Sequence, residues 1–483
     1  MFRLLLIVSL FFASHALSAA PEISGDDALR DLRIAKRGLT DLHAGLYRYI
    51  TEAELDAAFD RANAQVKDGT DHAQMYLVIS QLAALVRCGH TWTNFRNQPE
   101  VIQQKVFALA NKLPFTVRLI GTRLLVTHSA SKDVAVGAQI LTIDSRSVPE
   151  LIKALLPYLR ADGDSNGKRM AQIDHSGEFS AIDQIMPLLY PPKDGRYALT
   201  LAQGERIRSV RVDAITSAER ADVLRAQGVA APSASWALKI NGDTATMTLP
   251  TFAFWDGKFD GKAWFTDAFT RLNAEKVRYL IIDQRANEGG DDALGRTLTS
   301  MLLRAPYTQP TFRVESAYER APYILARYLD TWDFDFFDRT GQVQKGVGRN
   351  WLFKEQPAPL TIQPAALAWR GRTIALVGPN NSSAGFLLAR DLKASHAAYL
   401  IGQTTGGNLR GLNGGQLAWM TLPASKVSFD IPLRAAIAPH GTANAGLQPD
   451  LVVKPNLGKI RQGIDQEMRA AQALIAAWRK ARP

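Results

Sequence analysis

Apolar residues recur every three or four positions between residues 25 and 87, a spacing that places them on one face of an α-helix. The pattern predicts three helices, in "DDALRDLRIAKRGLTDLHAGLYRYI", "TEAELDAAFDRANAQVKDG" and "DHAQMYLVISQLAALVR". Thr51 and Glu54 have the spacing of a capping box at the second helix start. The third helix is more apolar, which predicts burial, and Gly89 is expected to end it so that His90 emerges in a loop.

From residue 113 the pattern changes to short alternating segments. "LPFTVRLIGTRLLVTHSA" predicts a hairpin, "GAQILTIDSRSVPELIKALLPYL" a strand, a turn and a helix, and "LAQGERIRSVRVD" a closing hairpin. Together they predict a module over 113–215 that resembles a divergent PDZ domain. Such a module binds an extended peptide as an added strand.

Strands and helices alternate from about residue 235. "WALKINGDTATMTLPTFAF" predicts a hairpin, and "DAFTRLNAEKVRYLIIDQRANEGG" predicts a helix, a strand and a glycine-bearing loop. The continuously apolar strands "YLIID" and "IALVG" are typical of a sheet that is covered on both faces. We therefore expect an α/β core over 235–456, followed by one C-terminal helix over 457–483.

The first residues, "MFRLLLIVSLFFASHALSAAPE", have the pattern of a secretory signal peptide. Arg3 precedes an apolar run, and small residues follow at Ala16, Ser18, Ala19 and Ala20. The run is too short to anchor the chain in a bilayer. We expect a signal peptide over 1–19, a helical region over 20–100 and export, to the periplasm of a bacterium.

Composition describes a folded protein of several domains, with 46% hydrophobic and 21% charged residues in 483. The net charge of +11 is scattered without a long basic run, so nucleic acid is not an expected partner. Cys88 is the single cysteine, which excludes an intrachain disulfide. Its adjacency to His90 does not favour a Cys/His nucleophile, because such pairs usually come from distant positions.

The stretch "IALVGPNNSSAGFLLARDLK" places Ser382 and Ser383 at the joint between a buried strand and a helix. One interpretation is a helix cap, because a serine side chain satisfies a free amide of the first turn. The other is a nucleophile beside a helix N-terminus, whose amides stabilise an oxyanion. The joint alone favours the cap.

Three stretches in fixed order change that balance: "LIIDQRANEGG", then "SSAGFLLARDLK" with "IGQTTGG", then "GLQPDLVV". Together they resemble the tail-specific (C-terminal processing) serine peptidases, family S41. The resemblance implies a multidomain α/β fold: a ClpP/crotonase-like spiral core with a helical N-terminal region and an inserted PDZ-like module. It implies an endopeptidase acting on peptides or unfolded proteins, with no metal and no cofactor. Stable membrane insertion is not expected, and the oligomeric state is not predicted.

Within this resemblance Ser383 matches the nucleophile, and Ser382 is the alternative. One branch of the family uses a lysine base, but Gly407 stands at that position here. The chain is instead similar to the branch related to the tricorn core, whose base is a histidine from the helical region. "CGHT" then implies His90 as the base, with a pKa suited to neutral pH. His43 and His440 are the alternatives.

The oxyanion hole implied by the resemblance consists of the Ala384 amide and the amide of Gly289 or Gly290, with Asn287 fixing the loop. The chain also departs from the family. Phe386 replaces an acidic residue, Ala286 replaces a glycine, and "TANAG" offers no carboxylate before the closing motif. The residue that orients His90 is therefore unassigned.

Two alternatives to the peptidase remain open. A weak or inactive homologue on the same fold would bind a peptide or an apolar ligand, with the aromatic segment 328–342 as a candidate lining. An esterase would use the same Ser383 and His90 on a smaller acyl substrate.

Overall fold

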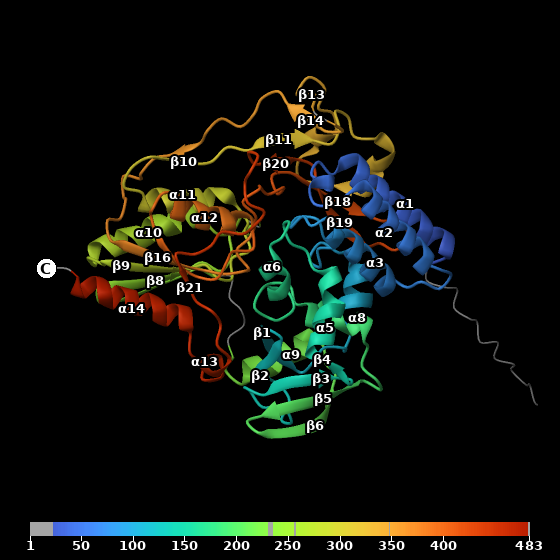
Figure 1. Cartoon of the computed structure of the whole chain (residues 1–483), viewed down its shortest axis with the longest axis horizontal. Helices are drawn as coiled ribbons and strands as arrows, with labels where there is room; N and C mark the ends of the chain where they lie inside the picture. Colours follow the sequence, from blue (N-terminus) through green and yellow to red (C-terminus); the bar gives the residue numbers. More distant parts are fainter. Residues whose placement is uncertain (1–22, 230–234, 256, 347, 482–483) are drawn as a thin grey trace, which may run out of the picture.

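The computed structural model describes residues 23–229, 235–255, 257–346 and 348–481 (Figure 1). The predicted signal peptide lies outside these residues. The three expected N-terminal helices are α1 (Gly25–Leu42), α2 (Glu52–Gln65) and α3 (His72–Leu85). The capping box at Thr51 is confirmed, because Thr51 and Glu54 exchange both hydrogen bonds. Gly89 does not end α3 as expected. The helix ends four residues earlier, and Arg87 follows with a left-handed φ of 56°.

The inserted module is built on a mainly antiparallel sheet of order β1-β2-β3-β5-β6, at the bottom of Figure 1. β4 pairs with β3 and leads directly into α5, the predicted strand, turn and helix. Its PDZ likeness stays a prediction. The elements are β1 (Phe115–Ile120), β2 (Arg123–Ser129), β3 (Gln139–Ile143), β4 (Arg146–Ser147), α5 (Val148–Leu155), α6 (Asn166–Ala171), α7 (Ala181–Gln184), α8 (Met186–Leu189), β5 (Arg196–Gln203), β6 (Arg206–Asp213) and α9 (Ser217–Ala226).

The core sheet has the order β21-β17-β16-β9-β8-β7, and its five strands from β21 to β8 are parallel. Helices α10, α11 and α12 cover one face and α14 covers the other, which confirms the predicted two-sided burial (Figure 1). The bounds are β7 (Ala237–Asn241), β8 (Thr244–Thr248), α10 (Gly261–Ala274), β9 (Tyr279–Asp283), α11 (Asp292–Leu302), β16 (Arg372–Val377), α12 (Ser383–Ala394), β17 (Tyr399–Gly402) and β21 (Leu451–Val452).

The prediction of one C-terminal helix is wrong. The chain forms α13 (Leu457–Arg461) and α14 (Gln466–Lys480) with a break between them. Gly463 adopts a φ of 68° in the break, which a continuing helix does not allow. Asp465 then caps α14 by accepting the amide of Met468.

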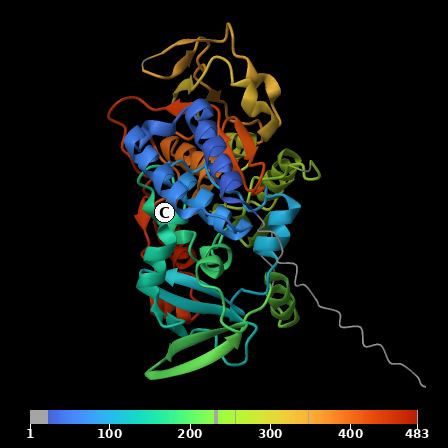
Figure 2. The ribbon, with the colours of Figure 1, turned by 90° about the vertical axis from the view of Figure 1, so that its right-hand side faces the viewer.

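Smaller sheets join the core to the N-terminal helices. β18 and β19 pair with each other, and their apolar residues share one buried cluster with α1, α3 and the inserted module. Figure 2 shows the N-terminal helices above that module. The short strands are β10 (Tyr307–Thr308), β11 (Arg313–Ser316), β12 (Leu329–Asp330), β13 (Val343–Lys345), β14 (Trp351–Phe353), β15 (Thr361–Ile362), β18 (Leu417–Thr421), β19 (Ser428–Pro432) and β20 (Ala435–Ile437).

The aromatic segment 328–342 lies along this part of the fold. β12 pairs with β18, and Phe336 is buried in the shared cluster. Trp332 and Phe334 are more than half exposed, at 58% and 59%. The segment therefore extends a sheet. No helix in the described ranges is long and apolar enough to cross a membrane.

Candidate active site

The two serines at the joint before α12 do not cap the helix. Ser382 occupies the cap position but forms no capping hydrogen bond, and its hydroxyl donates to the carbonyl of Glu288 at 3.1 Å. Ser383 has a φ of 47°, in the left-handed region that side chains other than glycine rarely adopt. A sharp strand-to-helix turn of this kind exposes a nucleophilic hydroxyl at the edge of a sheet. The capping interpretation is therefore wrong for both residues.

Asn381 ties this joint to two other loops of the site. Its side-chain carbonyl accepts the amide of Gly378 at 2.8 Å, and its amide group donates to the carbonyl of Asn287 at 3.1 Å. Its backbone carbonyl accepts the amides of Gly406 and Gly407. Asn381 thus joins the start of α12 to the loop after β9 and to the "TTGG" segment.

The loop after β9 lies directly against Ser383. Asn287 fixes this loop, because its side chain accepts the Gly289 amide at 2.9 Å and donates to the Leu249 carbonyl at 3.1 Å. A Cβ atom on Gly289 would lie only 2.6 Å from Cβ of Ser383, and the φ of Gly289 is 120°. Only glycine allows this approach.

The three predicted oxyanion donors differ in their availability. The Ala384 amide belongs to the first turn of α12, which has no acceptor within the helix. The Gly289 amide is bonded to Asn287. Gly290 pairs with Phe252 through the groups of its two neighbours, so its own amide faces away from Phe252. Ala384 and Gly290 are thus the better pair, and their roles stay predictions.

His90 lies beside the serine. Its Nε2 is 3.2 Å from Ser383 Oγ, and a Cβ atom on Gly414 would lie 2.6 Å from the same nitrogen. Burial lowers the pKa of His90, and the nearby charge of Asp162 opposes this shift. A base of lowered pKa is neutral at pH 7 and able to accept a proton.

Asp162 was missed from the sequence, because "RADGDSNGKR" has only the pattern of a polar loop. Its carboxylate is 4% exposed, and Oδ1 accepts the amide of Gly89 at 2.8 Å. A Cβ atom on Gly89 would lie 2.5 Å from Oδ2, so the glycine permits the carboxylate to approach the His90 segment. The Nδ1 atom of His90 is buried without a hydrogen-bond partner in the described part of the chain.

Asp162 reaches the site near the segment in which the family carries its carboxylate. Asn444, from "TANAG", accepts the amide of Asp164 at 3.2 Å and an N–H of Asn408 at 2.8 Å. The same Asn408 side chain donates to the Asp162 carbonyl at 3.0 Å. Asn408 therefore links the backbone at Asp162 to the segment "TANAG".

A buried ion pair also supports the loop after β9. Lys168 Nζ lies 2.7 Å from the Glu288 carboxylate, and Arg160 lies 3.7 Å from it. Burial lowers the pKa of Lys168, and the negative charge of Glu288 opposes that shift. Lys168 thus forms an ion pair with Glu288, the residue that directly precedes Gly289 in the sequence. Nothing local in the sequence indicates this pairing.

The remaining candidates lie elsewhere. His43 is buried and bonded to Thr91, and His440 is exposed in a loop. Burial raises the pKa of Cys88, which disfavours the thiolate. A Cβ atom on Gly407 would lie 2.3 Å from the Phe386 ring, so two of the departures from the family pack against each other. In the described residues no three His, Cys, Asp or Glu side chains are grouped so as to hold a metal ion.

Comparisons with known proteins concern the family and the fold. Residues 243–453 match the model of peptidase family S41. Mature CPAF complexed with lactacystin has a TM-score of 0.63 at 16% identity, covering 93% of this chain and 97% of that chain. Mature CPAF has a TM-score of 0.61 at 16% identity, covering 93% and 96%. The photosystem II D1 C-terminal processing protease has a TM-score of 0.40 at 14% identity, covering 89% and 93%.

No curated protein matches the sequence. The fold shared with CPAF confirms the predicted multidomain α/β class. The core is similar to peptidase family S41 over residues 243–453, and this match supports the predicted serine-type peptidase.

Proposed function

We propose that the protein is an exported endopeptidase that cleaves peptide bonds through an acyl-enzyme on Ser383, with His90 as general base. The observation that carries the proposal is the 3.2 Å contact between His90 Nε2 and Ser383 Oγ. A serine hydroxyl becomes a nucleophile at neutral pH only when a base takes its proton, and this contact has the required reach.

In the proposed reaction Nε2 of His90 takes the hydroxyl proton while Ser383 Oγ attacks the scissile carbonyl carbon. The carbonyl oxygen becomes an oxyanion, which accepts the amides of Ala384 and Gly290 at the positive end of α12. The imidazolium then gives its proton to the leaving amine, and the acyl group remains esterified to Ser383. A water molecule, deprotonated by His90, hydrolyses this ester and restores both residues.

Asp162 is proposed as a positioning residue in this reaction. Its buried negative charge beside the Gly89–His90 peptide favours the imidazolium over the neutral ring. This charge offsets part of the desolvation that opposes protonation of His90. Asp162 would thus stabilise the imidazolium in place of the carboxylate that the family carries before its closing motif and that this chain lacks.

Export is part of the proposal and is supported by the first residues alone. Their basic start, apolar run and small residues have the order of a signal peptide. Fractionation of cells that express the full chain, with N-terminal sequencing of the product, tests this part. Cleavage near residue 19 is expected, and an intact N-terminus in the cytoplasm would contradict it.

Labelling with a fluorophosphonate probe tests the catalytic part. The wild type should be labelled covalently, and Ser383→Ala and His90→Ala should not. Ser382→Ala is the matched control and should retain labelling, because its hydroxyl is bonded to the loop. Labelling lost in Ser382→Ala but kept in Ser383→Ala would assign the other serine. No labelling of the wild type would favour the binding protein.

A fluorogenic peptide and a short-chain aryl ester, compared on the same preparation, separate a peptidase from an esterase. We expect Ser383-dependent cleavage of the peptide. Turnover of the ester alone would support the esterase.

A further inference from the structure

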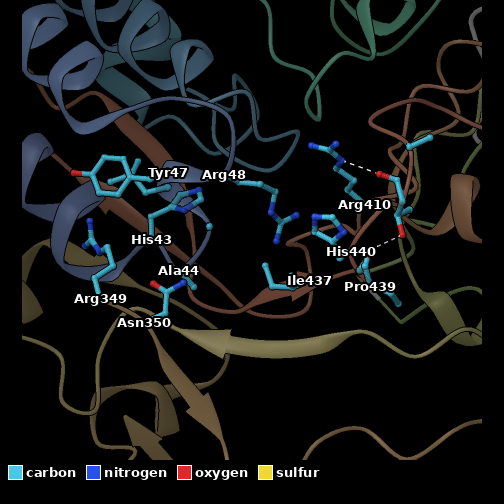
Figure 3. A pocket seen from close by; sticks show the side chains of 16 residues that line it. His43, Ala44, Tyr47, Arg48, Arg349, Asn350, Arg410, Ile437, Pro439 and His440 are labelled. Atoms are coloured by element: carbon cyan, nitrogen blue, oxygen red, sulfur yellow. Dashed lines mark hydrogen bonds between the residues drawn. The ribbon is translucent and has the colours of Figure 1, made fainter. Parts of the chain in front are cut away.

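A cavity of about 650 Å³ lies between the segment that follows α1 and the strand β20 (Figure 3). Its wall includes the short helix at Leu46–Arg48 and the loop after β20. Three arginines and two histidines line it: Arg48, Arg349, Arg410, His43 and His440. Among the described residues that line the cavity none is Asp or Glu.

The three guanidinium groups are held by neutral partners. Arg48 donates to the carbonyls of Gly411 at 3.2 Å and Ala436 at 2.8 Å. Arg410 donates from Nε to the Thr442 carbonyl at 3.0 Å, and Arg349 donates to the Thr40 carbonyl. These bonds orient the groups, and no carboxylate of the described residues forms an ion pair with any of the three. Each guanidinium has five N–H donors, so donors remain for a ligand.

His43 supplies a separate sign of a polar ligand. The ring is 1% exposed, and burial lowers its pKa to about 3, so it is neutral. Its Nε2 is bonded to Thr91 Oγ1 at 2.8 Å, whereas Nδ1 has no partner among the described residues. A buried polar atom without a partner is costly, and a ligand or water in the adjoining cavity would satisfy it.

The cavity adjoins the catalytic base through two consecutive residues. A Cβ atom on Gly45, in the cavity wall, would lie 2.7 Å from the Asn413 side chain. The next residue, Gly414, packs against the His90 ring. Asn413 and Gly414 thus link the cavity wall to the His90 ring.

We propose that this cavity binds a carboxylate of the peptide substrate, either an acidic side chain or the C-terminal carboxylate. Planar guanidinium groups match a carboxylate in shape and charge. Ile437 and Pro439 in the same wall suit the neighbouring hydrocarbon. The inference rests on the proposed function only in naming the occupant as a substrate.

Fluorescence anisotropy on the chain carrying Ser383→Ala tests binding without turnover. The probe is a fluorescein-labelled peptide of alanine and leucine with one glutamate and a free C-terminus. Two variants of the probe separate the sources of the carboxylate: glutamate replaced by glutamine, and the C-terminus amidated. We expect one of these changes to weaken binding about tenfold, and added salt to weaken binding of the acidic peptide. Equal affinity of all three peptides would overturn the proposal, with no change made to the protein.

Protein variants then locate the site. Arg410→Gln and Arg349→Gln should each weaken binding of the parent peptide about tenfold and leave unaffected the binding of the probe variant whose lost carboxylate weakened it. Arg271→Gln, an exposed arginine on α10, is the matched control for loss of one charge and should bind like the parent. If Arg271→Gln weakened binding of the acidic peptide as much as the two cavity variants do, the assignment of the binding site to this cavity would be overturned. Because all binding is measured without Ser383, failure of acyl-enzyme formation in the wild type would refute the proposed function alone.

Discussion

His90 Nε2 lies 3.2 Å from Ser383 Oγ although 293 positions separate the two residues in the chain. His90 follows the N-terminal helices, whereas Ser383 begins a helix of the core. The pair can form only when these parts pack together. The site is therefore a product of the packing between domains.

The acid limb of the pH profile should lie below the range of an ordinary histidine. Burial lowers the pKa of His90, and the base acts only when neutral. We expect kcat/KM to rise with pH through an apparent pKa below about 6.5. Stopped assays with a fluorogenic peptide across the acidic range measure it. An apparent pKa above that value would mean that a nearby carboxylate raises the pKa of His90 more than burial lowers it.

Asp162→Asn should lower kcat/KM about 100-fold and move the acid limb to still lower pH. The sign follows because the Asp162 charge raises the pKa of His90, so its removal lowers it. Asp164→Asn is the matched control, two residues away and more exposed. A purely structural role would reduce activity without moving the limb.

Gly289→Ala should abolish labelling of Ser383, because the new Cβ atom would lie 2.6 Å from the serine Cβ. Gly204→Ala is the control for backbone strain. Gly204 has a φ of 62° in the turn between β5 and β6, with no atom near its Cβ direction. It should lose about 1–2 kcal/mol of stability and keep its activity. Retained labelling in Gly289→Ala would show that the loop moves aside.

Lys168→Met should destabilise the fold by about 3 kcal/mol, because it leaves the Glu288 carboxylate buried with only a distant arginine. Lys168→Met with Glu288→Gln should recover most of this loss. Arg196→Ala removes an exposed ion pair and should cost less than about 1 kcal/mol. Urea unfolding measures all three. A double variant as unstable as the single one would show that the loss is one of packing.

Asp430→Asn should stabilise the protein, and more at alkaline than at acidic pH. Burial raises the pKa of Asp430 to about 7, far above that of an unfolded aspartate. The folded state therefore binds the proton more tightly, and stability falls as the pH rises from about 4 to 7. The gain in Asp430→Asn should be about 2–3 kcal/mol larger near pH 8 than near pH 5. Asp213→Asn, at an exposed carboxylate, should show no such difference.

Much of the fold could be predicted from the sequence, because its signals are local. Periodicity located the N-terminal helices, and continuous apolar strands indicated the covered sheet. The joint alone favoured a helix cap, and only the ordered stretches that resemble family S41 indicated Ser383 as the nucleophile. The break at Gly463 was missed because the apolar pattern continues across it.

The rest of the site depends on contacts between distant segments. Asp162 and Lys168 come from a polar loop whose composition gives no sign of burial, and each meets its partner only in the folded chain. The choice among the amides of the "NEGG" loop depends on hydrogen bonds of Asn287 and Phe252. Such pairings have no periodicity or motif that a single sequence could reveal.

The buried Cys88 can report on motion of the segment that carries His90. It is the single thiol of the chain, is 3% exposed and stands two residues before His90. A thiol reagent can modify it only when this segment opens, so the rate of modification counts opening events. If a bound peptide holds the segment shut, the thiol should react more slowly in its presence. The Cys88 thiol is thus a natural reporter of opening near His90, and no engineered label is needed.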